Sequence, residues 1–394
     1  MLFKKKDTLP LNDNLNEGNR NIFIVAGEAS GDMYGADLVK EMLNIYPDLC
    51  FYGIGGNKLK EAGVELIADA AKISVVGLTE VLSKLSNFFK IIKKLKDKLD
   101  ALKPALVILI DFPDFNLNIV ARQAKKRNIK IFYYISPQVW AWRKGRIKQI
   151  KKLVDKMAVI LPFEVDLYAE NNFGVSYVGH PLVDIVKVNV SKVEARRKLG
   201  LSEDKTTIGL LPGSRTAEIK SLLPEMMQAA QILKKNIKSA QFILPQADTL
   251  DETIINEIIS KYDIEIKIIA GRTYEAIFCC DLAVVTSGTA TLETGLLGVP
   301  MIIVYKVSLL SYLIGRLVIN VENIGLVNII AGKTVVPEFI QKDANGRQIA
   351  AEALAILESE KRYEQIKKEL SAISAKLGNP GATARAAKIA CEMI

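Results

Sequence analysis

The sequence is poor in the residues that hold metals or form disulfides. Its 394 residues include one histidine, His180, so a site with two or more histidine ligands is excluded and a Ser-His-Asp triad would have to use His180. No C-x-x-C pair is present, which argues against a zinc site and a disulfide framework; the four cysteines are Cys50, Cys279, Cys280 and Cys391. We expect a protein without a metal or a cofactor.

Long apolar runs are also missing. The longest runs, residues 105–110 and 301–305, fall far short of the roughly 20 residues that a membrane-spanning helix needs. Residues 7–20 are polar and lack the apolar stretch of a signal peptide, so we interpret residues 1–20 as a disordered tail. These features predict a cytoplasmic protein and leave contact with a membrane surface open.

The length and the charge narrow the class further. A chain of 394 residues is about twice the length of a typical domain, so two domains are expected. The apolar share of 49% and the charged share of 25% are those of an ordinary globular protein. The net charge of +9 favours anionic partners: a nucleotide, a phosphorylated substrate, nucleic acid or an acidic membrane surface.

Short apolar, β-branched runs alternate with amphipathic helical patterns, which is typical of a parallel α/β sheet buried on both faces. The runs lie at residues 21–26, 105–110, 130–135, 157–161 and 175–178, then at 207–211, 241–244, 265–270, 282–286 and 300–305. The pattern breaks near residues 180–198. We therefore predict an α/β fold of two doubly wound, Rossmann-like domains facing each other across a cleft. They span residues 21–186 and 187–360, and helices at 361–394 pack back on the first domain.

Two acidic motifs follow predicted strands of the first domain. The small-residue turn AGEASGD at residues 26–32 carries Glu28 and Asp32, whose carboxylates suit sugar hydroxyls better than a phosphate. An ordinary turn with Ser30 as the N-cap of the next helix is the alternative interpretation. The glycines at residues 53–56 are a weaker signal, because they lack the full G-x-G-x-x-G spacing and follow no clear strand with an acidic residue about 20 residues further on.

The second acidic motif is IDFPDFN at residues 110–116. It begins at the carboxyl end of a predicted strand, where open α/β sheets bind ligands. We assign Asp114 to capping of the next helix and Asp111 to catalysis as a general base. Phe112 and Phe115 beside Asp111 would raise the pKa of its carboxyl toward a useful value.

The second domain has two glycine turns suited to a diphosphate. In the first, Gly213 and Ser214 offer the backbone, and Arg215 would neutralise charge on a leaving group. No Gly-Lys-Ser/Thr follows, so the turn is not a Walker A loop. In the second turn, the hydroxyls and amides of Ser287, Gly288 and Thr289 would face the diphosphate, and Glu293 would bind ribose hydroxyls. A capping box of Thr289 and Glu293 fits imperfectly, because the spacing is four.

Three further segments could bind a lipid or an anion. Residues 136–146 contain both tryptophans beside basic residues, a combination that suits a sugar phosphate, a lipid headgroup or single-stranded nucleic acid; a solvated basic helix is the alternative. Residues 81–102 form a lysine-rich amphipathic pattern that suits an anionic interface, or from Ile92 onward a helix packed on the sheet. Residues 309–319 are a second, mostly apolar candidate.

Together the ordered motifs resemble the lipid-A-disaccharide synthase family of bacterial GT-B glycosyltransferases. The matching segments are AGEASGD, IDFPDFN, SPQVWAWR (136–143), YVGHPLVD (177–184), LLPGSR (210–215) and SGTATLE (287–293). The resemblance implies metal-independent, inverting transfer from UDP-2,3-diacylglucosamine to 2,3-diacylglucosamine 1-phosphate, which yields a β-1,6-linked disaccharide of lipid A biosynthesis. It implies that Asp111 deprotonates the acceptor 6-hydroxyl, with Glu28 as a further catalytic candidate, that Arg215 acts on the leaving group and that Glu293 lies beside the nucleotide.

The resemblance also implies peripheral association with the anionic inner-membrane surface and no nucleic-acid partner, and it leaves the oligomeric state open. A UDP-sugar epimerase and a muramyl-pathway N-acetylglucosaminyltransferase are the alternatives with the same two-domain plan. A protein that binds nucleic acid or anionic lipid without catalysis is the alternative from a different class.

Overall fold

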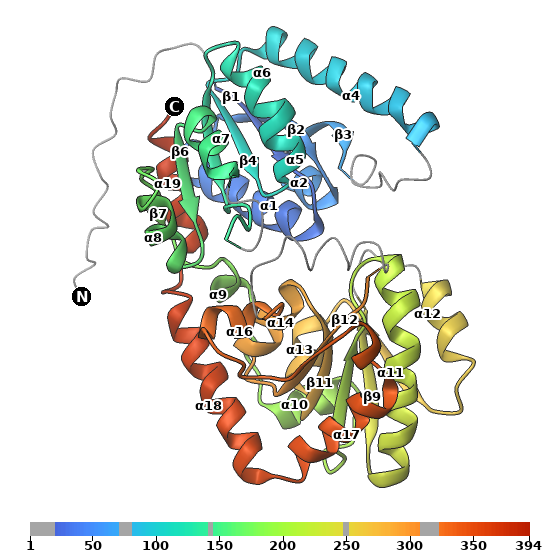
Figure 1. The fold of residues 1–394 in the computed structure, drawn as a ribbon. Coiled ribbons are helices and arrows are strands. Elements are labelled where there is room, and N and C mark those ends of the chain that lie inside the picture. The colour runs from blue at the N-terminus through green and yellow to red at the C-terminus, as the bar shows by residue number, and fades with distance from the viewer. Residues whose placement is uncertain (1–19, 71–80, 141–144, 247–251, 308–322) are drawn as a thin grey trace, which may run out of the picture. The chain divides into compact units, whose positions relative to one another are not determined.

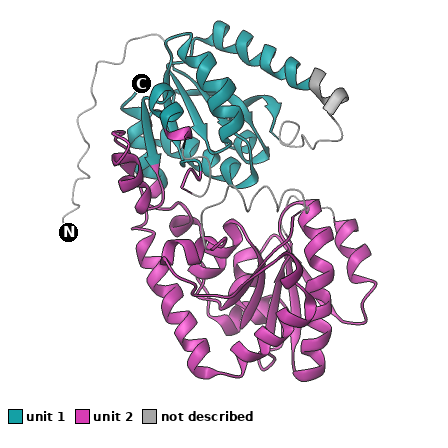
Figure 2. Ribbon diagram, viewed as in Figure 1, with its two compact units in different colours: residues 1–137, 148–158, 383–394 teal, residues 138–147, 159–382 magenta. Residues whose placement is uncertain are grey.

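The computed structural model describes residues 20–70, 81–140, 145–246, 252–307 and 323–394, so residues 1–19 of the predicted tail lie outside the described residues. The chain forms two compact units (Figure 2). Unit 1 comprises residues 1–137, 148–158 and 383–394, and unit 2 comprises residues 138–147 and 159–382.

The first sheet has seven strands in the order β3-β2-β1-β4-β5-β6-β7 (Figure 1). From β3 to β6 the strands run parallel. The strand order reverses between β1 and β4, because β1 leads outward through β2 and β3 whereas β4 leads the other way through β5 and β6. The strands are β1 (Asn21–Ala26), β2 (Cys50–Gly55), β3 (Glu65–Asp69), β4 (Leu106–Ile110), β5 (Lys130–Tyr134), β6 (Lys156–Val159) and β7 (Ser176–Tyr177).

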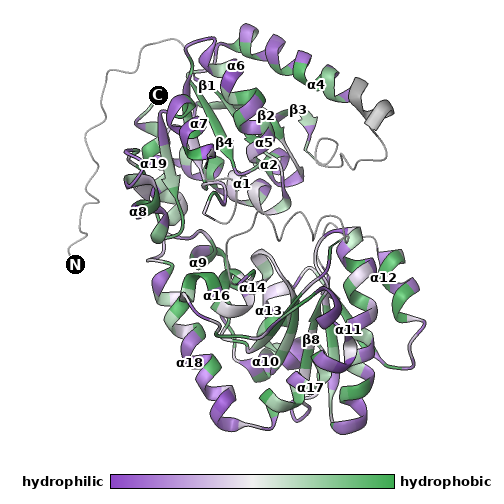
Figure 3. Cartoon of the chain, in the orientation of Figure 1, coloured by the Kyte–Doolittle hydropathy of each residue, from purple (hydrophilic) through white to green (hydrophobic). Residues whose placement is uncertain are grey.

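Helices connect these strands. The central strand β4 is buried along its whole length, as expected of a parallel strand covered on both faces, and Figure 3 shows its hydrophobic character. The helical elements from residue 29 to residue 185 are α1 (Ala29–Ile45), α2 (Asn57–Glu61), α4 (Val81–Leu102), α5 (Pro113–Phe115), the π-helix η1 (Asn116–Val120), α6 (Ala121–Lys125), α7 (Arg146–Leu153), α8 (Phe163–Ala169) and α9 (Leu182–Ile185). Of these, α8 and α9 belong to unit 2.

The second sheet has six parallel strands in the order β10-β9-β8-β11-β12-β13. Its order reverses between β8 and β11, which are both fully buried. The strands are β8 (Thr207–Leu211), β9 (Gln241–Gln246), β10 (Ile266–Ala270), β11 (Leu282–Thr286), β12 (Met301–Tyr305) and β13 (Glu338–Ile340). The helical elements from residue 192 onward are α10 (Lys192–Lys198), α11 (Thr216–Asn236), α12 (Glu252–Ile259), α13 (Thr273–Phe278), α14 (Thr289–Leu296), α16 (Leu326–Ala331), the short η2 (Gln341–Asp343), α17 (Gly346–Leu357), α18 (Glu360–Lys376) and α19 (Ala382–Cys391). All of α19 except its first residue belongs to unit 1.

The two parallel, doubly wound sheets confirm the predicted fold class, and each predicted apolar run overlaps a strand. Three strands were not predicted: β2, β3 and β13. The glycines Gly53 and Gly55 lie within β2 itself. Gly53 lies where β2 passes β1 so closely that a Cβ atom would come within 1.9 Å of the carbonyl oxygen of Ile24.

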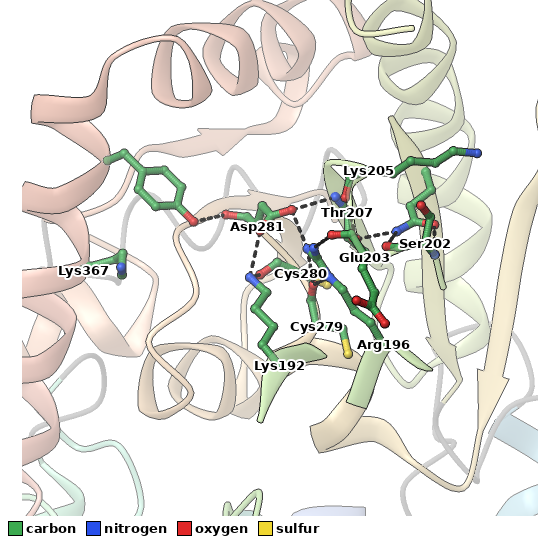
Figure 4. A network of polar contacts seen from close by, with 12 residues as sticks. Lys192, Arg196, Ser202, Glu203, Lys205, Thr207, Cys279, Cys280, Asp281 and Lys367 are labelled. Carbon is green, nitrogen blue, oxygen red and sulfur yellow. Dashed lines mark hydrogen bonds and ion pairs between the residues drawn. The ribbon is translucent and has the colours of Figure 1, made fainter. Parts of the chain in front are cut away.

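A charged network ties α10 to the amino-terminal ends of β8 and β11 (Figure 4). The Asp281 carboxylate accepts hydrogen bonds from Lys192 Nζ (2.8 Å), Arg196 Nη2 (2.7 Å) and the Thr207 amide (2.8 Å). Burial alone would raise the pKa of Asp281, but these donors outweigh burial and the pKa is lowered. Burial raises the pKa of the neighbouring Cys279 thiol to about 11. The network lies at the sheet end opposite the strand carboxyl ends, so we interpret it as structural.

Candidate functional site

The predicted site residues lie in turns or first helical turns that follow four strands: β1, β4, β8 and β11. These are the two adjacent pairs at which the strand orders reverse. In open α/β sheets such reversal points leave a crevice outside the carboxyl ends of the strands, where ligands bind. In unit 1 this topology brings together the turns that carry Glu28 and Asp111. In unit 2 it brings together the turn at Gly213–Arg215 and the turn at Ser287–Thr289.

The two turns of unit 1 pack directly on each other. A Cβ atom added to Gly27, after β1, would lie 2.1 Å from Cγ of Phe112, after β4, so only glycine fits there. The Phe112 ring stacks on Phe115 with centroids 5.4 Å apart, and Phe115 meets Phe88 of α4 edge-on at 6.1 Å. Glu28 is exposed at the N-cap of α1. An aromatic cluster therefore borders the turn that carries Asp111.

The backbone at Asp111 is strained. Asp111 and Phe112 both have positive φ angles, 41° and 46°, in a region that residues with a side chain seldom occupy. Ile135, just after the adjacent strand β5, has a φ of 69°, which is unusual for a β-branched residue. Backbone strain of this kind persists where surrounding contacts enforce it, and it is concentrated at functional sites.

Two side chains hold the Asp111 backbone in this conformation. The Tyr133 hydroxyl donates to the Asp111 carbonyl oxygen at 2.5 Å. The Asn116 side-chain amide donates to the same oxygen at 2.7 Å and to the Ile110 carbonyl oxygen at 3.2 Å. Asn116 is fully buried and begins η1, and π-helical turns are frequent at functional sites. The pattern of the sequence did not predict either of these roles.

The assignment of Asp114 to helix capping was wrong, and the two capping alternatives, Ser30 and the box of Thr289 with Glu293, do not hold either. Helix α1 begins at Ala29 with Glu28 as its N-cap, so Ser30 is not the cap. Phe112, in its left-handed conformation, precedes α5, so Asp114 lies in the first turn and not at the cap. Glu293 does not close a capping box, because the residue before α14 is Gly288, which has no side chain, and the Glu293 carboxylate accepts a hydrogen bond from Tyr274 instead. The three helices instead begin after Glu28, Phe112 and Gly288, and none of these residues caps its helix with a side-chain hydrogen bond.

Asp32 is a structural anchor. Its carboxylate is buried and accepts hydrogen bonds from the amides of Gly56 (2.6 Å), Lys58 (2.9 Å) and Leu59 (3.3 Å) at the start of α2. A helix N-terminus attracts an anion, and here the chain provides that anion itself. The carboxylate of Asp32 therefore occupies the position that a phosphate would take at this glycine turn.

In unit 2, the turn after β8 is also bonded to a carboxylate of the chain. Glu218 Oε2 accepts hydrogen bonds from the amides of Ser214 (3.1 Å) and Arg215 (3.3 Å). Glu218 Oε1 accepts a hydrogen bond from Arg215 Nη1 at 3.2 Å. In this conformation these two amides donate within the protein, and Ser214 and the Arg215 side chain are both exposed.

The turn after β11 is arranged differently. No side chain caps α14, and the Thr286 hydroxyl at the end of β11 is buried without a hydrogen-bond partner among the described residues. The Ser287 hydroxyl donates to the Ile324 carbonyl oxygen at 2.9 Å. One turn into α14, burial raises the pKa of Glu293, and the hydrogen bond from the Tyr274 hydroxyl (3.2 Å) partly offsets that rise. Among the described residues, the start of α14 therefore has no capping side chain, and the Glu293 carboxyl near it is bonded to Tyr274.

The structure describes the first and part of the second of the three segments that were predicted to bind a lipid or an anion, residues 81–102, 136–146 and 309–319. Trp140 meets Phe163 edge-on with centroids 5.5 Å apart, whereas residues 141–144 lie outside the described residues, as do residues 309–319. In α4, Ile91, Leu95 and Leu99 are buried, which confirms that this part of the helix packs on the fold, and Phe89 is 63% exposed. Over the described ranges, no helix is long and apolar enough to cross a membrane. No group of three potential metal ligands occurs in those ranges either.

His180 has no features of a catalytic base. It is buried, its Nδ1 accepts a hydrogen bond from the Leu182 amide at 3.2 Å, and burial lowers its pKa to about 3. The imidazole is therefore neutral at physiological pH and serves the chain turn that precedes α9.

Comparison with solved structures defines the class of protein. The fold resembles a UDP-GlcNAc 2-epimerase from Neisseria meningitidis bound to UDP-GlcNAc, with a TM-score of 0.58, 12% identity and coverage of 95% of this chain and 99% of that one. It also resembles CalG4, the calicheamicin glycosyltransferase, with a TM-score of 0.57, 12% identity and coverage of 95% and 98%. The chain therefore has the two-unit GT-B fold that such enzymes share.

Sequence comparison identifies the family. Residues 22–393 match the family model described as lipid-A-disaccharide synthetase. The lipid-A-disaccharide synthase of Syntrophus aciditrophicus is 58% identical over 374 residues, which cover 95% of this chain and 97% of that protein. The chain belongs to the lipid-A-disaccharide synthetase family, and the family resemblance predicted from the motifs is confirmed.

The hydrogen bonds of Asn116 predict a test of the strained turn. Substitution Asn116→Ala removes both side-chain bonds to buried carbonyl groups, so we expect a loss of about 2 kcal/mol in the free energy of unfolding. Urea denaturation measures this loss. Asn118→Ala is the matched control, because Asn118 is exposed and its Oδ1 accepts one hydrogen bond from Gln149. Equal, small losses of unfolding free energy in both variants would show that the Asn116 hydrogen bonds do not hold the turn.

Proposed function

We propose that the protein transfers 2,3-diacylglucosamine from UDP to the 6-hydroxyl of 2,3-diacylglucosamine 1-phosphate, with inversion at the anomeric carbon. The product is the β-1,6-linked disaccharide 1-phosphate, and UDP leaves. Family membership supports this reaction. The structural observation that carries it is the position of Asp111 in a strained, clamped turn at the reversal point of the first sheet.

In this mechanism the Asp111 carboxylate accepts the proton of the acceptor 6-hydroxyl. The hydroxyl oxygen then bonds to the anomeric carbon while the bond from that carbon to the UDP oxygen breaks. A fixed base contributes most when its position is held before the substrate arrives, and the bonds from Tyr133 and Asn116 hold the Asp111 backbone. Glu28, across the packed turns, is the second acidic group available to sugar hydroxyls.

On the donor side, the uncapped start of α14 binds the diphosphate of UDP. A helix start with no capping side chain leaves amides that suit an anion, and Gly288 allows close approach of the ligand. Ser287, Thr289 and the buried Thr286 hydroxyl add polar contacts, and Arg215 compensates the charge that develops on the departing UDP. Glu293 accepts hydrogen bonds from the ribose hydroxyls.

A UDP-sugar epimerase is the alternative with the same fold. The likeness to the epimerase is a likeness of fold at 12% identity, whereas the sequence relative at 58% identity is a lipid-A-disaccharide synthase. Incubation with both proposed substrates separates the two functions, because mass spectrometry detects an acylated disaccharide in one case and an epimerised UDP-sugar in the other.

The acyl chains of both proposed substrates require contact with a lipid surface, and we propose the anionic inner membrane. Helix α4 combines the exposed Phe89 with exposed lysines on the side away from its buried stripe; they are Lys90, Lys93, Lys94 and Lys96. Basic side chains flanking an apolar group favour an anionic interface.

Substitution Asp111→Asn tests the general base. The amide preserves the size of the side chain and accepts no proton, so we expect kcat to fall by about 10²- to 10⁴-fold. UDP affinity should stay within about twofold of the wild type, since Asp111 lies in unit 1 and the proposed UDP groups lie in unit 2. Steady-state kinetics and calorimetric titration with UDP measure the two quantities. Near-normal turnover would remove Asp111 from this role.

Protonation of Glu293 should weaken donor binding. The carboxylate, present above the pKa, accepts ribose hydroxyls, and burial raises that pKa above its ordinary value. We therefore expect the donor KM to rise as the pH falls through this raised pKa, and Glu293→Gln to have a higher KM that changes less with pH. Kinetics between about pH 5 and pH 8 measure both effects. An unchanged KM in the variant would exclude the ribose contact.

Vesicle flotation tests the membrane proposal. The wild-type protein should float with vesicles that contain anionic phospholipid at low salt, and less at high salt, because the attraction is electrostatic. Replacement of Lys90, Lys93 and Lys94 by Gln should reduce flotation. Equal flotation with neutral vesicles, or none with anionic vesicles, would contradict the proposed surface.

A further inference from the structure

The turn that follows β8 uses its backbone amides within the protein. The carboxylate of Glu218 bonds to the amides of Ser214 and Arg215 through one oxygen and to the Arg215 guanidinium through the other. Gly213 lies against the same carboxylate: its φ is +106°, and a Cβ atom there would lie 2.2 Å from Glu218 Oε2. The turn is thus folded around Glu218.

The two charged side chains of the turn differ in exposure. The Glu218 side chain is 17% exposed, whereas the Arg215 side chain is 62% exposed. An exposed ion pair three residues apart on a helix contributes little to stability. What the pair changes is the freedom of Arg215, because a fixed carboxylate limits the rotamers of a long side chain before a ligand binds.

The turn that carries the pair lies beside the turn after β11. Strands β8 and β11 are hydrogen-bonded neighbours that run parallel, so the turns at their carboxyl ends lie at the same edge of the sheet. The turn after β11 carries Ser287–Thr289, the proposed diphosphate site. The charges of Glu218 and Arg215 also act on Tyr305 at the end of β12, the next strand of the sheet, where burial is the main cause of a raised pKa.

We infer that Glu218 is a positioning residue, which holds the Arg215 guanidinium toward the diphosphate at the start of α14. The turn after β8 thus presents a guanidinium to UDP, and its amides stay bonded to Glu218. This inference rests on the proposed function, since it assumes that UDP binds to unit 2. An ordinary helix cap, which would stabilise α11 and leave Arg215 unaffected, is the alternative role.

A double-mutant cycle on UDP binding separates these roles. The proteins are wild type, Arg215→Ala, Glu218→Gln and the double variant, each titrated with UDP by calorimetry. Gln keeps an acceptor oxygen for the amides and loses the charge that holds Arg215. We expect each single variant to bind UDP about tenfold more weakly, and the double variant to bind no more weakly than Arg215→Ala.

Glu225→Gln is the matched control. Glu225 lies two turns further along α11, pairs with Lys306 at 2.7 Å and accepts the Gly346 amide at 3.0 Å. The Glu225→Gln variant should bind UDP with the affinity of the wild type, even if the melting temperature of the variant is lower. The inference would be overturned if the losses of UDP affinity in the two single variants multiplied in the double variant, or if Glu218→Gln bound UDP as tightly as the wild type. Neither result would contradict the proposed function. A wild-type protein that binds no UDP would overturn both.

Discussion

Both candidate sites depend on the reversal of strand order within a parallel sheet. Successive connections from β1 and from β4 proceed to opposite sides of the sheet, as do those from β8 and β11. The two turns at each reversal therefore diverge, and the strand ends between them stay open to a ligand. Parallel direction brings all the turns to one edge. Residues far apart in the sequence, such as Gly27 and Phe112, meet there because of topology and not because of any local motif.

Hydrogen bonding within the chain distinguishes the glycine turns from one another. Asp32 occupies the amides at the start of α2, and Glu218 occupies those after β8. In the described part of unit 2, α14 begins with no such carboxylate. Three turns that look alike in sequence thus have different capacities. The difference comes from acidic residues that approach from a neighbouring turn or from one helical turn onward.

Much of the fold follows from sequence pattern, because buried parallel strands are continuous apolar runs. The missed strands have compositions that weaken this signal: β2 contains two glycines, β3 has an acidic residue at each end, and β13 has three residues. The sequence also predicted that the proposed site residues follow strands, and the structure places them after β1, β4, β8 and β11. It did not predict the clamp of Tyr133 and Asn116 or the bond from Tyr274 to Glu293, because these depend on packing between separate elements.

In the proposed mechanism, the strained backbone at Asp111 has a physical consequence for catalysis. A flexible loop would lose conformational entropy each time it brought a base to a substrate. Here the conformational entropy is lost during folding, because buried side chains fix the left-handed residues Asp111 and Phe112 beside the fully buried strand β4. Arg215 is restrained in a similar way, because the largely shielded carboxylate of Glu218 accepts a hydrogen bond from its exposed guanidinium. In each unit, hydrogen bonds within the chain therefore restrain a proposed site residue before any substrate is bound: the backbone of Asp111 in unit 1 and the side chain of Arg215 in unit 2.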